Sequence, residues 1–241
     1  MQCHNTRNGL HNDSVPLSYS SMFPHTPSQA DILMGQNSYF TGITGTTTVF
    51  VSKHANIGDT CATCHMQLNP DNPNNAAYSH EFAIPSADQG QLCANCHGSG
   101  VNGYGLQTEV QGLLSTINTA ILSDASNVIN NSTPIVYAGL QPLTLPVTVT
   151  GISGYGTANV SLTDSGSHTL SIAIDQITTT TGKVFPIDGS NITSTVVVKS
   201  LWNYSLVNTE GSNGIHNPTY ELTILNNTLT CLNNPASGIC Q

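Results

Sequence analysis

The chain has 241 residues, of which 38% are hydrophobic and 7% are charged, and its formal net charge is −9. Because it has only four Lys and Arg residues in total, it lacks the basic patch that binding to nucleic acid or to an anionic lipid surface would need. No apolar run approaches the roughly 20 residues that a helix needs to cross a bilayer. The many Val, Ile and Thr residues predict a folded chain that contains strands rather than a disordered one.

The first residues, Met1-Gln2-Cys3-His4, match the end of a C-x-x-C-H sequence. In such a sequence each cysteine can form a thioether to a haem vinyl group, and the histidine after them binds the iron. The missing first cysteine would stand one place before Met1, so either the chain was cut there or its haem is held by a single thioether. A stray Cys-His pair is the alternative. We favour a haem that is attached at Cys3 and has His4 as an axial ligand.

Two complete C-x-x-C-H sequences follow, one at residues 61–65 and one at residues 93–97. A zinc site or a redox dithiol would also use paired cysteines, but neither explains a histidine directly after both pairs. The sequence therefore predicts haem c, with three haems expected in all. The predicted attachment residues and iron ligands of the two complete sequences are Cys61, Cys64, His65, Cys93, Cys96 and His97.

Each haem iron needs a second axial ligand, and the remaining histidines can supply it. His25 lies between two prolines, which stiffen the backbone and can present the imidazole at a low entropic cost. His54 precedes the first complete C-x-x-C-H sequence, and His80 lies between the two. These three are the predicted distal ligands here, whereas His11 is expected at the surface. Because haem faces would replace part of the side-chain core, residues 1–105 are expected to be largely irregular, with few helices.

The middle of the chain changes from a helical to a β-rich pattern. Apolar residues at helical spacing predict a helix over 106–134. Residues 135–198 hold short β-branched runs separated by Gly, Asp and Ser, which predict an inserted antiparallel β-sandwich or small barrel. His168 lies at a turn there and is expected to be solvated. The predicted fold class is therefore α+β, and the expected strands are 143–150, 158–162, 169–177 and 184–187.

The last part of the chain, residues 199–241, is expected to return to helix over the haem region. Helical character spans about 195–207, and a turn-rich stretch that contains His216 leads into a final helix. That helix is expected over about 218–229, because proline at position 218 suits a first helical turn.

Haem is attached to c-type proteins outside the cytoplasm, so we expect an extracellular or cell-surface protein. The chain has no basic start followed by an apolar core, and residue 1 is therefore not expected to be the translation start. In an exported protein Cys231 and Cys240, which lie outside any C-x-x-C pair, usually form a disulfide; a metal site or free thiols are the alternatives. Glycosylation sequons occur at Asn131, Asn159, Asn191 and Asn203.

Several short sequences follow one another in a fixed order: Cys3-His4-Asn5-Thr6, Pro24-His25-Thr26-Pro27, Leu33-Met34-Gly35-Gln36, Lys53-His54-Ala55, the two C-x-x-C-H sequences and, much later, Trp202-Asn203-Tyr204 and Gly214-Ile215-His216-Asn217-Pro218. This succession resembles the haem-binding region near the C-terminus of large multihaem c-type cytochromes of bacterial and archaeal cell surfaces. The resemblance covers residues 1 to about 100 and the two late stretches. It implies that His216 also ligates iron, because family members keep a haem-ligating histidine in this setting.

The predicted ligands favour electron transfer, because an iron with two axial imidazoles has no open position for a substrate. The alternative, a multihaem reductase of a small oxyanion such as nitrite, would need a vacant haem face and cationic residues, and Arg7 is the one arginine. A third hypothesis is a filament in which haems stack from copy to copy. Expected partners are accordingly other redox proteins or further copies of this chain.

The histidine count bears on that third hypothesis. The distal candidates His25, His54, His80 and His216 outnumber the proximal His4, His65 and His97 by one. The surplus histidine could serve a fourth haem, either in a missing upstream segment or in a neighbouring subunit.

Overall fold

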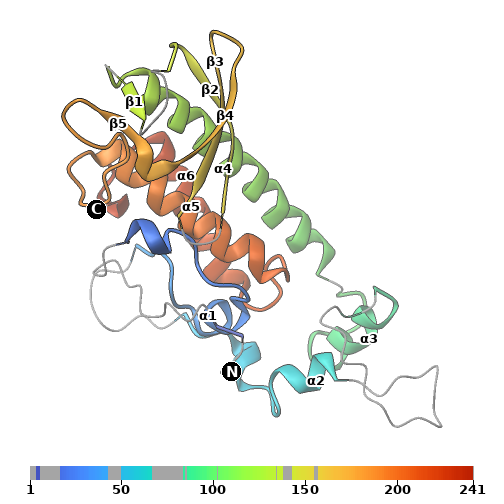
Figure 1. The fold of residues 1–241 in the computed structure, drawn as a ribbon. Helices are drawn as coiled ribbons and strands as arrows, with labels where there is room; N and C mark the ends of the chain where they lie inside the picture. Colours follow the sequence, from blue (N-terminus) through green and yellow to red (C-terminus); the bar gives the residue numbers. More distant parts are fainter. Residues whose placement is uncertain are drawn as a thin grey trace.

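A computed structural model of the chain describes residues 4–5, 17–42, 50–66, 84, 86–101, 103–133, 135–137, 143–154 and 157–240, with the backbone alone for 86–88, 91 and 135–137. It is 51% helical and 12% strand, which confirms the predicted mixture of helix and sheet. Three long helices pack against one another (Figure 1): α4 (Tyr104–Asn130), α5 (Ile192–Glu210) and α6 (Pro218–Asn233). No helix in the described part of the chain is both long and apolar enough to cross a membrane.

The burial of the three helices follows from their sequences. In α4 the buried residues Val110, Leu114, Ile117 and Ile121 recur every three or four positions, so one face packs on α5 and α6 while the other meets solvent. Helix α5 is buried on nearly all sides, and its buried residues include the polar Ser194, Asn203 and Glu210. It begins three residues earlier than predicted, because the side chain of Asn191 caps it.

The β-rich segment forms two small open sheets. Strands β2 (Val147–Ser153), β3 (Asn159–Asp164) and β4 (Thr169–Ala173) make a three-stranded antiparallel sheet, and β1 (Ile135–Tyr137) pairs with β5 (Ile177–Thr179). The expected run 169–177 is divided by the 3-10 helix η3 (Ile174–Gln176). Neither sheet closes among the described residues, so the expected sandwich or barrel is not found. The strand expected at 184–187 is also wrong, because this segment packs inward without forming a strand.

The three-stranded sheet packs directly on α4. The Asn130 side chain donates to the Val147 carbonyl at 3.0 Å and accepts from the Val147 amide at 2.7 Å. The hydroxyl of Ser126 accepts from the Val149 amide at 2.9 Å. Apolar residues that alternate along the strands, such as Val149 and Leu162, join the same hydrophobic core as the three helices. The β-rich segment and the helices therefore share one core.

The helices in the described part of the first hundred residues are short, in line with the expectation of a largely irregular region. In chain order these are η1 (Tyr19–Ser21), α1 (Gln29–Met34), η2 (Lys53–Asn56), α2 (Cys61–His65) and α3 (Ser86–His97). Helices α1, α2 and α3 lie together at the lower end of the molecule in Figure 1, below the ends of the long helices. This end carries the two complete C-x-x-C-H sequences.

Two neighbouring residues of α5 hold the loop that follows α1. The Trp202 indole donates to the Asn37 carbonyl at 2.6 Å. The Asn203 side chain accepts from the Tyr39 amide at 2.8 Å and donates both to the Tyr39 carbonyl at 2.8 Å and to Thr228 at 2.9 Å. Asn203 is 0% exposed, so these bonds satisfy backbone groups that have no access to water.

Replacing Asn203 with alanine should therefore destabilise the protein strongly. The substitution leaves the buried amide and carbonyl of Tyr39 without their partner, and we expect the free energy of unfolding to fall by about 2–4 kcal/mol. Chemical denaturation of the purified protein, followed by far-UV circular dichroism, measures this. The matched control is Asn226→Ala on the exposed side of α6, which should change stability by less than about 0.5 kcal/mol. Equal effects of the two substitutions would contradict the anchoring role of Asn203.

The C-terminal tail folds back on α6. The sulfur atoms of Cys231 and Cys240 are 2.14 Å apart, which is the distance of a disulfide, as predicted. Both cysteines are buried, and the short 3-10 helix η4 (Gly238–Cys240) packs against α6. The cross-link thus fastens the end of the chain to the helix that begins just after His216.

Candidate haem-binding site

The two complete C-x-x-C-H sequences lie on helical segments, the first forming α2 and the second ending α3. Cysteines three residues apart on a helix share one face, so each pair of thiols can point the same way. All four thiols are free. Burial raises the pKa of the Cys64 thiol, and the neighbouring thiols of Cys93, Cys61 and Cys96 raise it further. The two cysteine pairs are therefore close to each other.

The histidine of the second motif faces His54. The ring centroids of His54 and His97 are 5.9 Å apart, and their planes are nearly perpendicular, at 84°. His54 lies in η2, and its Nδ1 is 2.8 Å from the carbonyl oxygen of Ile215. When Nδ1 carries the proton that is donated to this carbonyl, the lone pair of Nε2 is left for a metal. His54 is thus presented to His97 in the tautomer that a distal ligand needs.

The histidine of the first motif faces His216. The ring centroids of His65 and His216 are also 5.9 Å apart, with 55° between the planes. His216 belongs to the turn between α5 and α6, and its Nδ1 is in contact with the Glu210 carboxylate. Gly214 lets this turn pack on α4: its φ is +101°, and a Cβ there would lie 2.9 Å from Leu106.

The spacing of both histidine pairs fits a haem iron held between them. Two imidazole nitrogens on opposite sides of one metal, each at the usual distance of about 2.0 Å, separate the ring centroids by about 6 Å. A haem iron takes only two ligands from the protein, because the porphyrin supplies the other four. Among the described residues no three His, Cys, Asp or Glu side chains are grouped so that they could hold one metal ion.

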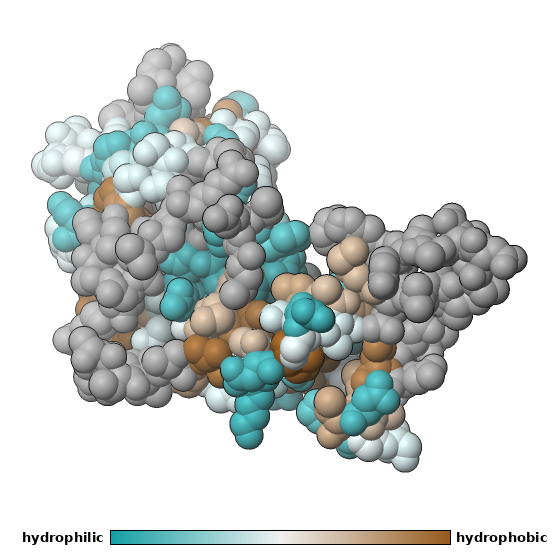
Figure 2. All heavy atoms as spheres, turned by 90° about the horizontal axis from the view of Figure 1, so that it is seen from below, coloured by the Kyte–Doolittle hydropathy of each residue, from teal (hydrophilic) through white to brown (hydrophobic). Residues whose placement is uncertain are grey.

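Three of the four large hydrophobic residues that are exposed in the described part of the chain lie near the motifs in sequence, and the fourth, Ile192, begins α5. Met66 directly follows α2, Val101 comes soon after α3, and Tyr104 begins α4. Their exposed fractions of 37%, 42% and 43% are high for large hydrophobic side chains of the described residues. Figure 2 shows the lower face of the molecule, where brown apolar residues gather among teal polar ones. A flat apolar group such as a porphyrin could cover side chains of this kind.

Of the other predicted ligands, the structure describes His4 and His25. His4 is half-buried, and its Nδ1 is 3.4 Å from Oε1 of Gln29. His25 is half-buried and lies a few residues before α1 in the chain. Cys3 and His80 lie outside the described residues, as does His11. His168 lies at a turn, as expected, and its side chain is 69% exposed. Its Nδ1 is 3.2 Å from Asp164, and hydrogen bonds from His168 lower the pKa of the Asp164 carboxyl.

Sequence reasoning missed two acidic residues beside His216. Glu210 ends α5 and Glu221 lies in the first turn of α6, and they are 2% and 0% exposed. Burial raises the pKa of Glu221 to about 9, the negative charge of Glu210 adds to this, and the Gly214 amide opposes it slightly. The oxygens of Glu221 have no hydrogen bond of normal geometry within the described part of the chain. Glu221 is therefore a neutral acid at pH 7. The sequence signal was that each is the one acidic residue of its helix.

Comparison with protein-family models, with curated proteins and with solved structures finds no match for this chain. The functional assignment therefore rests on the residues and contacts described above.

Proposed function

We propose that this protein is an extracellular multihaem c-type cytochrome that transfers electrons along closely spaced haems. The observation that carries the proposal is the pair of histidine contacts, because each one joins the histidine of a C-x-x-C-H motif to a histidine from a distant part of the chain at about the distance that a shared iron requires. When bound, haem iron supplies a one-electron couple.

The haem of each complete C-x-x-C-H motif would be held by two cysteines and two histidines. Cys61 and Cys64 would attach the first haem between His65 and His216. Cys93 and Cys96 would attach the second between His97 and His54. Cys3 and His4 would hold a third, with His25 or His80 opposite. In every case two imidazoles would fill the axial positions and exclude a substrate, so the arrangement favours electron transfer over reduction of a small oxyanion.

Two features support rapid transfer between the haems. The thiols of the two complete motifs lie close enough to influence one another electrostatically, so the attachment points are neighbours. The ligands are also interleaved, because the carbonyl next to His216 accepts the hydrogen bond of His54, the ligand of the other haem. Electrons would then pass between haems held in one compact cluster.

Partners would be other redox proteins or copies of this chain, with a filament as one form of assembly. The disulfide at Cys231 and Cys240 is compatible with an oxidising, extracellular environment. The surplus distal histidine could ligate a haem of a neighbouring subunit.

Native protein is expected to carry three covalent haems and to be low spin throughout. Intact mass after denaturation counts the haems, and electron paramagnetic resonance of the oxidised protein reports the spin state. A high-spin signal from a third or more of the haem would contradict the proposal and favour a reductase. Zinc in place of haem would mean that the motifs are metal-binding cysteine pairs.

A further inference from the structure

The two distal histidines proposed above differ in what accepts the hydrogen bond from their Nδ1 atoms. For His54 the acceptor is a neutral peptide carbonyl, that of Ile215, at 2.8 Å. For His216 the acceptor is the side-chain carboxylate of Glu210. Both pairs have ring centroids 5.9 Å apart, with the ring planes at 84° for His54 and His97 and at 55° for His65 and His216. The two sites therefore share one spacing but differ in the charge of the acceptor.

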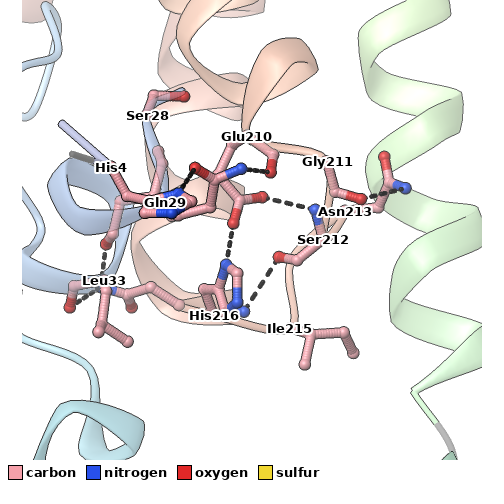
Figure 3. Close-up of polar contacts among 12 residues, drawn as sticks. His4, Ser28, Gln29, Leu33, Glu210, Gly211, Ser212, Asn213, Ile215 and His216 are labelled. Atoms are coloured by element: carbon pink, nitrogen blue, oxygen red, sulfur yellow. Dashed lines mark hydrogen bonds and ion pairs between the residues drawn. The ribbon is translucent and has the colours of Figure 1, made fainter. Parts of the chain in front are cut away.

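The Glu210 carboxylate is buried and held in place by hydrogen bonds (Figure 3). Its side chain is 0% exposed, and its second oxygen accepts a hydrogen bond from the Ser212 amide at 2.8 Å. The backbone carbonyl of Glu210 accepts from the Gln29 side chain at 2.7 Å, and Gln29 in turn contacts His4. The backbone amide of His216 donates to the Ser212 hydroxyl at 3.1 Å. Carboxylate and imidazole are thus both fixed in orientation.

We propose that Glu210 is a positioning residue that gives the haem held by His65 and His216 a lower reduction potential than the haem held by His54 and His97. This inference rests on the proposed function. A carboxylate draws the Nδ1 proton of His216 more strongly than a carbonyl does, so Nε2 becomes a better electron donor. Stronger donation stabilises the ferric state relative to the ferrous state. Burial strengthens the effect, since little water screens the carboxylate.

The consequence is an ordered pair of sites within one chain. Electrons would reside preferentially on the haem of His54 and His97, and would leave the haem of His216 more readily. Glu221 offers a matched control for this explanation, because it is a second buried acid near Glu210 but is not hydrogen-bonded to His216. A general effect of buried acidic groups would involve both residues, whereas a hydrogen-bond effect involves Glu210 alone.

The first experiment is a spectroelectrochemical titration of the fully haem-loaded Glu210→Gln variant at pH 7. The amide keeps an acceptor oxygen but removes the charge. One haem should titrate at a higher potential, with the ratio of reduced to oxidised haem at a fixed potential rising about tenfold, which is 59 mV for one electron. The other potentials should stay in place, and the matched Glu221→Gln variant should shift none of them. Unmoved potentials in Glu210→Gln, or equal shifts in both variants, would overturn the inference.

A second experiment leaves residue 210 intact, in case its substitution prevents folding. Met in place of a distal histidine raises the potential of the haem it ligates. In the unaltered protein, the potential that His216→Met moves should be lower than the potential that His54→Met moves. The opposite assignment would overturn the inference while leaving the proposed function standing. An unaltered protein without covalent haem, or with high-spin haem, would instead refute the proposed function.

Discussion

Replacing His216 with alanine is expected to open one axial position and to turn one of the proposed haems from low spin to high spin. The ring of His216 lies against that of His65, and its turn is fixed by Ser212 and by the close packing of Gly214. The substitution therefore removes the imidazole that faces His65. His54→Ala should have the same effect on the haem attached at Cys93. Electron paramagnetic resonance of each oxidised variant measures the high-spin fraction, expected to be about one third if three haems are present.

A matched control uses a histidine that is not predicted to bind iron. His168 is largely exposed and paired with Asp164, so His168→Ala should leave every haem low spin.

The assignment of each distal histidine to its haem is tested by first removing one haem through the double substitution Cys61→Ala and Cys64→Ala. In that background His216→Ala should add no high-spin signal, whereas His54→Ala should still do so. If the two results are exchanged, each distal histidine serves the opposite haem.

The three long helices could be predicted from the sequence because local patterns determine them. The apolar spacing of α4 and the proline at the start of α6 gave their positions to within a few residues. The form of the sheet depended on distant contacts instead. Asn130 and Ser126 bind the edge of β2 to α4, so the sheet is covered by a helix and does not need a second sheet. The run at 184–187 contains Val184 and Phe185, which are buried without strand pairing, and its composition alone could not reveal this.

Of the candidate site, too, the sequence could predict the local motifs but not the contacts between distant segments. The C-x-x-C-H motifs are local, so the sequence could name their residues. It could not pair His216 with His65 or His54 with His97, because the fold alone brings these segments together. Trp202 and Asn203 belong to a stretch that carries the resemblance, and their contacts with the loop after α1 give them a structural role. The sequence marks Glu210 only as the one acidic residue of its helix, since a carboxylate becomes a ligand partner only through the geometry of its turn.

Glu221 should make the stability of the protein fall as the pH rises. Its ordinary pKa of 4.5 is raised to about 9 in the folded state, chiefly by burial. The folded protein therefore favours the neutral acid. The contribution is fully present below about pH 4.5 and is lost as the pH rises through about 9, because the unfolded chain releases this proton earlier. The difference between the two pKa values corresponds to roughly 6 kcal/mol as an upper limit.

The Glu221→Gln variant isolates this contribution, since a glutamine side chain is neutral at every pH. Burying its amide adds an offset that does not depend on pH, so the informative quantity is the change of the difference between variant and wild type with pH. Denaturant unfolding at each pH, followed by far-UV circular dichroism, gives the free energy of unfolding of both proteins. The difference between them should be constant below about pH 4.5. From about pH 4.5 to about pH 9 the variant should become more stable relative to the wild type, by several kcal/mol in all. Titrating groups other than Glu210, which is coupled to Glu221, cancel in this comparison. Parallel profiles for the two proteins over the whole range would mean that the folded protein accommodates the charged Glu221 carboxylate as readily as the unfolded chain does.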